Sequence, residues 1–314
     1  MSEELFTGPP GLPADGRGTV VTVGTFDGVH RGHQAVLREV CQRADSTGSR
    51  SVLLTFHPHP LRIVRPEDAP SLLTTPLEKK EILAETGLDF AVFLAFTPAL
   101  SDFEPERFVR EVLVDRVGVS ELVIGYDHGF GRDRSGGMDT LRRLGQEMGF
   151  DVDVVEPVTT DEDAVSSTSI REAILDGDLE AATRRLGRPY SMRGVVVRGE
   201  GRGHDLGFPT ANLEVLGGDK LVPPAGIYAV RGVLRGGSVD GALHIGPRPT
   251  FRGSPPTVEL HLMDFEGDLY GEIVRVDFVK RLREVRPFAS AGDLIEQMGA
   301  DVGEARRVLA GGDP

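Results

Sequence analysis

The stretch Thr19–His33, which reads TVVTVGTFDGVHRGH, contains the clearest fold signal of the chain. Its first part, Thr19–Val23, is a β-branched run that favours a strand. Beyond the glycine-containing turn, the apolar residues of Gln34–Ala44 recur at helical spacing. A strand that passes through such a turn into a helix is typical of a parallel α/β sheet, in which ligands bind at the carboxyl ends of the strands.

The same alternation of strand and helix continues to about residue 186. The sequence predicts further strands at Ser51–Phe56, Asp89–Leu94, Glu121–Ile124 and Asp151–Val155, and helices at Leu77–Thr86, Pro105–Val114, Thr140–Met148 and Ser169–Leu186. This order predicts an α/β N-terminal domain with a parallel sheet that carries helices on both faces.

The pattern changes after Gly187-Arg188-Pro189. Short strand-like runs separated by Gly, Pro and Asp turns follow at Gly194–Arg198, Gly226–Leu234, Gly241–Ile245, Thr257–Leu262 and Glu272–Phe278. They predict a compact antiparallel barrel or sandwich, which a helix around Ala291–Leu309 follows. We therefore expect two domains, residues 1–187 and residues 188–314.

Composition excludes several classes of protein. The single cysteine, Cys41, cannot form an internal disulfide or a multi-cysteine metal site. The formal charge is 35 − 49 = −14, which argues against a protein that coats nucleic acid. No apolar run approaches the ~20 residues of a membrane span, and the acidic start Met1–Glu4 does not resemble a signal peptide. We expect a cytoplasmic protein that binds neither nucleic acid nor membranes and is a monomer or a weak homo-oligomer.

Two histidines mark the start of the first predicted helix. His30 and His33 are three residues apart, so one helical turn brings them to the same face. A helix N-terminus attracts phosphate, and imidazoles there can neutralise charge that develops on it. Gly32 removes a side chain where a ligand must come close. The pair alone also fits ordinary helix caps, and a metal site is disfavoured because no third ligand lies nearby in the sequence.

Three later loops of the same domain carry polar or aromatic groups. Residues 124–131 read IGYDHGFG after a predicted strand, residues 166–171 read SSTSIR before a predicted helix, and residues 55–60 read TFHPHP after another strand. Hydroxyls and an arginine at a helix start suit phosphate, although a plain N-cap has the same composition. The TFHPHP segment could line a pocket for a flat ring or simply form a rigid turn.

These four motifs, in this order, resemble the adenylyltransferase module of bacterial bifunctional riboflavin kinase/FAD synthetases. That module belongs to the H-x-G-H nucleotidyltransferases, so the resemblance implies a Rossmann-like fold for the first domain. It also implies roles for individual residues. The catalytic residues would be His30 and His33; the nucleotide-binding residues would be Gly24, Phe26, Asp27, Gly32, Gly125, Asp127, Ser167, Thr168 and Arg171; the flavin-binding residues would be Phe56, His57, Pro58 and Pro60.

The second domain contains a glycine-rich loop at residues 199–207, followed by Thr210 and Asn212. Loop amides can turn toward anionic oxygens, and hydroxyl and amide oxygens are ligands that Mg²⁺ takes beside phosphates. Downstream, Glu259 alternates with Val258 and Leu260, so its carboxylate lies on the opposite face of a strand and could accept a proton. Taken alone, the glycine-rich loop is more typical of a hairpin with turn residues, and Glu259 is more typical of a solvated strand glutamate.

The segments GFPTANL, PPAGIY, HIGPRPTF and ELHLMDFEGDLYG resemble the riboflavin kinase module of the same enzymes. This resemblance implies a six-stranded, mainly-β barrel with a C-terminal helix, in which riboflavin is phosphorylated to FMN before the first domain adenylylates FMN to FAD. Glu259 would be the general base, Thr210 and Asn212 would hold Mg²⁺, and Gly199, Gly201, Gly203 and Thr210 would contact the nucleotide. ATP would be the co-substrate of both reactions.

Four residues depart from the family pattern: His128, Ser169, His244 and Pro247. None of them removes a residue assigned to the chemistry. Two alternatives remain at this point. Only the kinase half is active, or the chain is a non-catalytic protein that binds flavin or nucleotide.

Overall fold

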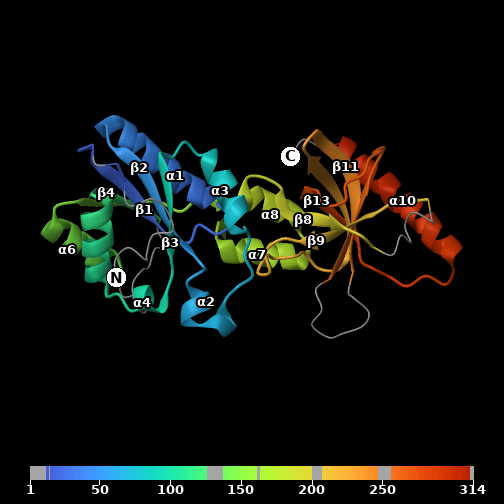
Figure 1. Ribbon diagram of the computed structural model, residues 1–314, viewed down its shortest axis with the longest axis horizontal. Helices are drawn as coiled ribbons and strands as arrows, with labels where there is room; N and C mark the ends of the chain where they lie inside the picture. The colour runs from blue at the N-terminus through green and yellow to red at the C-terminus, as the bar shows by residue number, and fades with distance from the viewer. Residues whose placement is uncertain are drawn as a thin grey trace. The chain divides into compact units, whose positions relative to one another are not determined.

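The computed structural model describes residues 12–13, 15–125, 137–160, 163–199, 207–246 and 256–311. The chain forms two compact units, Met1–Ser166 and Ser167–Pro314 (Figure 1). The division falls before the predicted domain boundary at residue 187, so the segment 167–186 packs with the barrel. The boundary between the two functional domains, at residues 187 and 188, stays a prediction.

The first unit is built on a five-stranded sheet in the order β3-β2-β1-β4-β5. The strands are β1 (Thr19–Val23), β2 (Arg50–His57), β3 (Phe90–Ala95), β4 (Val119–Gly125) and β5 (Asp151–Val155). All neighbouring pairs are parallel, which confirms the predicted α/β architecture. The strand order reverses between β1 and β4, and ligands of such sheets bind at the carboxyl ends of the strands at this switch point.

Helices cover both faces of this sheet (Figure 1). On one face, α1 (Arg31–Thr47) and α3 (Pro76–Ala84) pack on a core that includes Val20, Leu53 and Val123. On the other, the π-helix η3 (Val109–Val117) and α6 (Met138–Met148) pack on alternate residues of the same strands. The unit also contains the short elements α2 (Leu61–Val64), η2 (Pro66–Asp68), α4 (Pro98–Ser101), α5 (Pro105–Phe108), β6 (Thr159–Thr160) and β7 (Asp163–Ala164).

The prediction of one continuous helix at 169–186 is wrong. The structure has two helices, α7 (Ser167–Asp176) and α8 (Leu179–Leu186). Gly177 ends α7 with a φ of +80°, a conformation that favours glycine. The Asp178 carboxylate then accepts a hydrogen bond of 2.8 Å from the backbone N–H of Ala181 and begins α8. A glycine C-cap next to an aspartate N-cap explains the break.

The rest of the second unit is a closed antiparallel barrel, which resolves the choice between barrel and sandwich. Its strand order is β10-β11-β12-β9-β8-β13. The strands are β8 (Tyr190–Val197), β9 (Ala211–Val215), β10 (Gly226–Leu234), β11 (Gly237–Gly246), β12 (Thr257–Leu262) and β13 (Ile273–Arg283). Of these, β9 was not predicted. The predicted terminal helix is α10 (Ala291–Ala310), which packs on β10, β11 and β13.

Successive side chains of the barrel strands alternate between the inner and the outer face of the barrel. Along β12, Val258, Leu260 and Leu262 are buried, whereas the residues between them are partly exposed. Inside, the rings of Tyr228 and Phe278 pack edge to face with centroids 5.4 Å apart. The polar residues of β12 are therefore available on the outer side of the wall.

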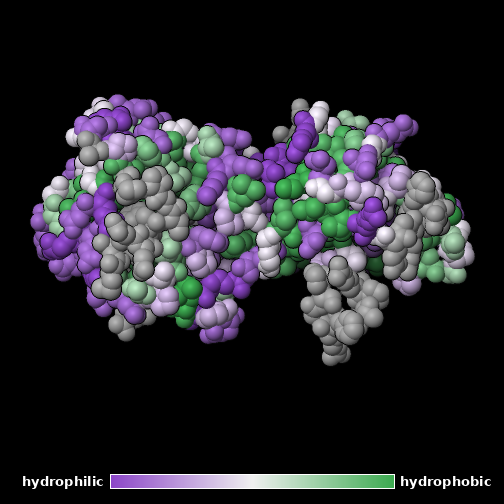
Figure 2. Space-filling model, viewed as in Figure 1, coloured by the Kyte–Doolittle hydropathy of each residue, from purple (hydrophilic) through white to green (hydrophobic). Residues whose placement is uncertain are grey.

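The visible surface of the first unit is largely hydrophilic, whereas apolar residues gather over the barrel strands (Figure 2). Residues 1–188 hold 20 basic and 32 acidic side chains, a balance of 20 − 32 = −12. Among the residues that the structure describes, no helix has the length and apolar character needed to cross a membrane.

Candidate active sites

Three aromatic rings stack at the carboxyl end of β1. The centroids of His30 and His33 are 3.6 Å apart, and the Phe26 ring stacks on His33 at 4.5 Å. His30 is the N-cap of α1, and its Nδ1 accepts a hydrogen bond of 3.4 Å from the backbone N–H of His33. The spacing of the histidines correctly predicts that they share a face. Because Nδ1 of His30 is an acceptor, Nε2 carries the proton of the neutral ring and is its remaining donor.

The loop that carries these rings has a strained backbone. Phe26 and Val29 have φ angles of +46° and +39°, which residues with bulky side chains rarely adopt. The backbone N–H of Gly28 donates to the Thr74 hydroxyl at 3.0 Å, and the side-chain amide of Gln34 donates to the Val29 carbonyl at 3.1 Å. Strain that neighbouring contacts hold in place is typical of functional loops.

Asp27 anchors this loop. Its carboxylate is 1% exposed and accepts hydrogen bonds of 3.0 Å from the backbone N–H groups of Leu73 and Thr74. The Thr74 hydroxyl donates a third bond to it, at 3.2 Å. Asp27 thus holds the loop that carries the histidines, and its role in nucleotide binding stays a prediction.

Gly24 and Gly32, two of the three glycines of the loop, make room for protein rings. A Cβ atom at Gly24 would lie 3.0 Å from the Phe26 ring, and one at Gly32 would lie 3.2 Å from the His30 ring. The sequence suggests that Gly32 leaves space for a ligand. In the structure, that space lets the His30 ring pack closely over the start of α1.

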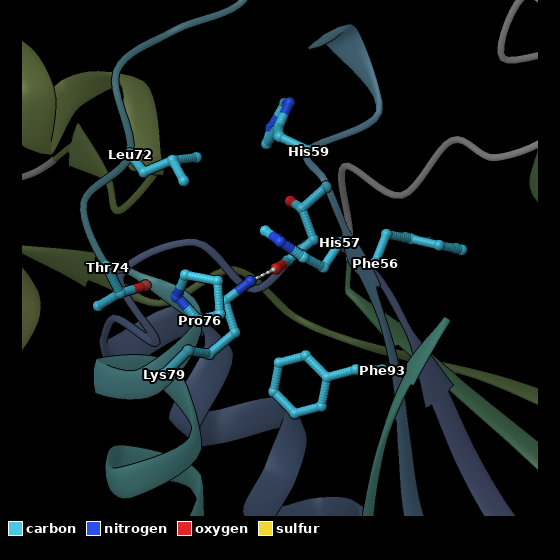
Figure 3. A pocket seen from close by; sticks show the side chains of 9 residues that line it. Phe56, His57, His59, Leu72, Thr74, Pro76, Lys79 and Phe93 are labelled. Atoms are coloured by element: carbon cyan, nitrogen blue, oxygen red, sulfur yellow. Dashed lines mark hydrogen bonds between the residues drawn. The ribbon is translucent and has the colours of Figure 1, made fainter. Parts of the chain in front are cut away.

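A pocket lies between α3 and the carboxyl ends of β2 and β3 (Figure 3). Its lining consists of Thr25, Phe56, His57, His59, Leu72, Thr74, Pro76, Lys79 and Phe93. Of the four residues predicted to bind flavin, Phe56 and His57 line this pocket, and Pro58 and Pro60 belong to the turn that follows. Sequence reasoning missed Lys79 and Phe93, because neither lies in a motif.

Lys79 is the buried cation of this pocket. Its Nζ donates a hydrogen bond of 2.6 Å to the carbonyl of Thr25, which lies in the histidine loop. Burial lowers the pKa of Lys79 from 10.5 to about 8, although the charge of Asp27 partly opposes this shift. Lys79 therefore joins the pocket to the histidine loop, as Thr74 also does through its hydroxyl.

The remaining predicted residues of the adenylyltransferase site lie on other elements. Gly125 ends β4, next to β1 in the sheet. Ser167, Thr168 and Arg171 lie in the first turns of α7, which belongs to the second unit. Asp127 and the departure His128 are outside the described residues, as is Pro247. Ser169 accepts a hydrogen bond of 2.8 Å at its backbone carbonyl from Arg185, so it helps to join α7 to α8.

The barrel brings the predicted kinase residues together. Glu259 on β12 is the direct cross-strand partner of Asn212 on β9. Thr210 directly precedes β9, two residues before Asn212. Directly opposed residues in an antiparallel pair have Cβ atoms ~5 Å apart. Residues almost fifty positions apart in the sequence thus form one cluster on the outer face.

Gly199 belongs to the same cluster. A Cβ atom at this position would lie 1.9 Å from the Asn212 side-chain amide nitrogen, so only glycine admits the amide here. Gly201 and Gly203, which were predicted to contact phosphates, are outside the described residues.

His244 on β11 is the other cross-strand partner of Glu259. Burial lowers the pKa of His244, the charge of Glu259 opposes that shift, and the charge of Arg283 adds to it. A residue that departs from the family pattern therefore lies beside the predicted general base, in surroundings that favour its neutral form.

The donor set of the cluster suits Mg²⁺. The Thr210 hydroxyl and the Asn212 amide are oxygen donors of the kind that Mg²⁺ takes beside phosphates, and Gly199 leaves the amide room. Within the described ranges, no group of three or more His, Cys, Asp or Glu residues could hold a metal ion. A cation here would therefore depend on these neutral oxygens and on the phosphates of the nucleotide.

Comparison with known proteins gives matches over both halves of the chain. A family model described as FAD synthetase matches residues 12–169, and one described as riboflavin kinase matches residues 186–309. A bifunctional riboflavin kinase/FMN adenylyltransferase from Pseudomonas fluorescens is 39% identical over 308 residues, which are 98% of each chain. The protein of the same name from Bacillus subtilis (strain 168) is 35% identical, and the match covers 93% of each chain.

A solved structure shares the fold of nearly the entire chain. It is a crystal structure described as a macrolide-efflux protein from Streptococcus pneumoniae, with a TM-score of 0.86 and 30% sequence identity. The match covers 97% of this chain and 96% of that one.

Proposed function

The chain belongs to the family of bifunctional riboflavin kinase/FMN adenylyltransferases, and from this we propose which of its residues carry out each reaction. It is a transferase with two activities. The C-terminal half phosphorylates riboflavin to FMN, and the N-terminal half adenylylates FMN to FAD.

In the adenylyl transfer, an oxygen of the FMN phosphate forms a bond to the α-phosphorus of ATP, and the bond from that phosphorus to pyrophosphate breaks. No covalent enzyme intermediate is needed, so catalysis consists of positioning and charge stabilisation. His30 and His33 donate to the phosphoryl oxygens as charge develops on them. The observation that carries this proposal is their stacked arrangement at the N-terminus of α1, at the switch point of the sheet. Ser167, Thr168 and Arg171 bind phosphate oxygens.

The pocket of Phe56 and His57 holds the isoalloxazine ring of FMN. Its lining combines aromatic faces with a few polar groups, as is typical of sites for flat heteroaromatic ligands. Pro58 and Pro60 stiffen the turn that closes it.

In the kinase reaction, Glu259 accepts the proton of the riboflavin 5′-hydroxyl, whose oxygen attacks the γ-phosphorus of ATP while ADP leaves. Thr210 and Asn212 hold Mg²⁺, which when bound offsets the negative charge of the phosphates. The adjacency of Glu259 and Asn212 on neighbouring strands supports this assignment.

We also propose a cytoplasmic enzyme that acts as a monomer or weak homo-oligomer on small molecules and not on nucleic acid. The net charge of −14 supports this, because it repels polyanions.

The test is to incubate the protein with riboflavin, ATP and Mg²⁺ and to separate the products by chromatography. We expect FMN and then FAD. In the double variant His30→Ala/His33→Ala, FMN should accumulate and FAD should be absent, because only the adenylyl transfer uses these rings. Loss of both products in a folded double variant would contradict the assignment of the two reactions to separate sites.

A further inference from the structure

Lys79 buries a charge at a place where the fold has no need of one. The residue lies in the first turn of α3 and is 8% exposed. Its Nζ donates to the Thr25 carbonyl at 2.6 Å. That carbonyl already accepts a hydrogen bond of 3.0 Å from the Thr55 hydroxyl, so the lysine is not required to satisfy it.

The helix does not need Lys79 either. The Thr75–Glu78 capping box begins α3: the Thr75 hydroxyl accepts from the Glu78 backbone N–H, and the Glu78 carboxylate accepts from the Thr75 backbone N–H at 2.8 Å. Burying an ammonium group is unfavourable, and the lowered pKa of Lys79 reflects this. A buried charge that the fold does not need, lying in a pocket, points to a function.

The surroundings of Lys79 indicate what it binds. In Figure 3 its side chain extends into the space between the turn at His57 and the Phe93 ring. One side of the pocket thus offers aromatic surface, and Lys79 offers N–H donors beside it. The complementary ligand is a flat ring whose edge carries hydrogen-bond acceptors, as the carbonyl oxygens and ring nitrogens of a flavin do.

We propose that Lys79 is a flavin-binding and positioning residue of the adenylyltransferase site. It donates to the acceptor edge of the isoalloxazine, and its bond to Thr25 fixes the loop that carries His30 and His33. Occupation of the flavin pocket is thereby linked to the geometry of the catalytic histidines. The inference rests on the proposed function, because that function places FMN in this pocket.

The proposal predicts a pH dependence. The titratable and charged groups that face Lys79 are Asp27 from the histidine loop, and His57 and His59 from β2 and the turn after it. The pKa of Lys79 is about 8, so its deprotonation between about pH 7.5 and 9 should weaken FMN binding.

The experiment uses the full chain with Lys79→Met, which keeps the length of the side chain and removes the charge, and Lys79→Arg, which keeps the charge. The matched control is Lys280→Met, an exposed lysine on β13 that does not line the pocket and whose Nζ donates to Glu180 at 3.0 Å. For each variant, the KM values for FMN and for ATP are measured in the adenylyl transfer. FMN binding is followed by the flavin difference absorption spectrum at several pH values.

We expect Lys79→Met to raise the KM for FMN by roughly 10- to 100-fold, the equivalent of one hydrogen bond from a charged donor, with little change in the KM for ATP. Its FMN affinity should not vary with pH, whereas that of the unmodified protein should fall as the pH rises through about 8. Lys79→Arg should recover part of the affinity and remove the pH dependence. Lys280→Met should bind FMN as the unmodified protein does.

A Lys79→Met protein with an unchanged KM for FMN would overturn the inference, as would an equal rise in the KM values for FMN and ATP. Circular dichroism and the melting temperature verify folding, and Lys79→Gln replaces the methionine variant if that one does not fold. Failure of the unmodified protein to make FAD would instead refute the proposed function. The two failures are therefore distinguishable.

Discussion

The proposed role of Glu259 as the general base rests on the residues that surround it. It pairs across the strands with Asn212 on one side and His244 on the other, in a row on the outer face of the barrel. The Phe208–Pro209 segment lies against the same strand, because His261 Nδ1 lies 2.9 Å from the Pro209 carbonyl oxygen and its ring packs edge to face with Phe208. The carboxylate therefore lies beside the segment that carries Thr210.

Replacement Glu259→Gln tests whether this carboxylate is a base. Glutamine keeps the shape and the cross-strand contacts but cannot accept the proton. We expect the kcat for riboflavin phosphorylation to fall by ~10²- to 10⁴-fold, as for other general bases. Formation of FAD from supplied FMN should be unchanged. Riboflavin phosphorylation at the original rate would show that Glu259 is not the base.

Lys79 should destabilise the fold at neutral pH. Its pKa is about 8 in the folded chain against 10.5 for an ordinary lysine in water, so between these values the unfolded chain binds more protons. The free energy of unfolding should therefore rise as pH increases from about 8 to 10.5, by at most about 3 kcal/mol. Lys79→Met should show a melting temperature at pH 7 that equals or exceeds that of the unmodified protein, and a smaller rise with pH. Equal pH slopes in the two proteins would contradict this explanation.

Helix α10 is attached to the barrel by two Asp–Arg pairs of different burial. The Asp301 carboxylate accepts bonds of 2.7 and 2.5 Å from Arg283 on β13, and these side chains are 9% and 21% exposed. Arg306 donates bonds of 2.7 and 3.2 Å to Asp264, but these side chains are 55% and 74% exposed. The two pairs differ mainly in their access to water, so they form a matched comparison.

Asp301→Asn should lower the free energy of unfolding by about 3 kcal/mol, because it leaves the guanidinium of Arg283 without its buried counter-ion. Asp264→Asn should lower it by less than about 1 kcal/mol, because water already screens that pair. Asparagine also suits the positive φ of +55° at position 264. Urea unfolding of the two variants measures the difference, and equal losses would show that burial does not set the strength of these pairs.

The sequence was most informative where the signal is local. The period of the apolar residues predicts β1 and α1, and the spacing of His30 and His33 predicts their common face. The sequence did not predict contacts between distant segments. The row Asn212–Glu259–His244 depends on the register of the strands, and β9 went unpredicted because it is short and of mixed polarity. Lys79 could not be found either, because α3 has no clear apolar face in its sequence, and two adjacent lysines do not reveal which of them is buried.

The two compact units of the molecule have separate cores. Leu144 is fully buried between η3, α6 and the parallel sheet, and Leu243 is fully buried in the barrel. The boundary between units does not follow the proposed division of functions, because Ser167, Thr168 and Arg171 lie on α7 of the second unit but are proposed to serve the adenylyl transfer. Damage to the two cores should therefore have unequal consequences.

Leu144→Ala and Leu243→Ala should each destabilise their own unit by ~2–5 kcal/mol. On mild heating, Leu144→Ala should lose FAD synthesis and keep riboflavin phosphorylation, because the barrel retains its core. Leu243→Ala should lose both activities together, because unfolding of the second unit also releases α7. Timed assays of the two reactions after heating, with FMN supplied for the second, measure this asymmetry.

If Leu243→Ala loses the kinase reaction but still converts FMN to FAD, then either α7 holds its structure without the barrel or its three polar residues do not serve the adenylyl transfer. Arg171→Ala separates these explanations, since it impairs FAD synthesis only if α7 takes part.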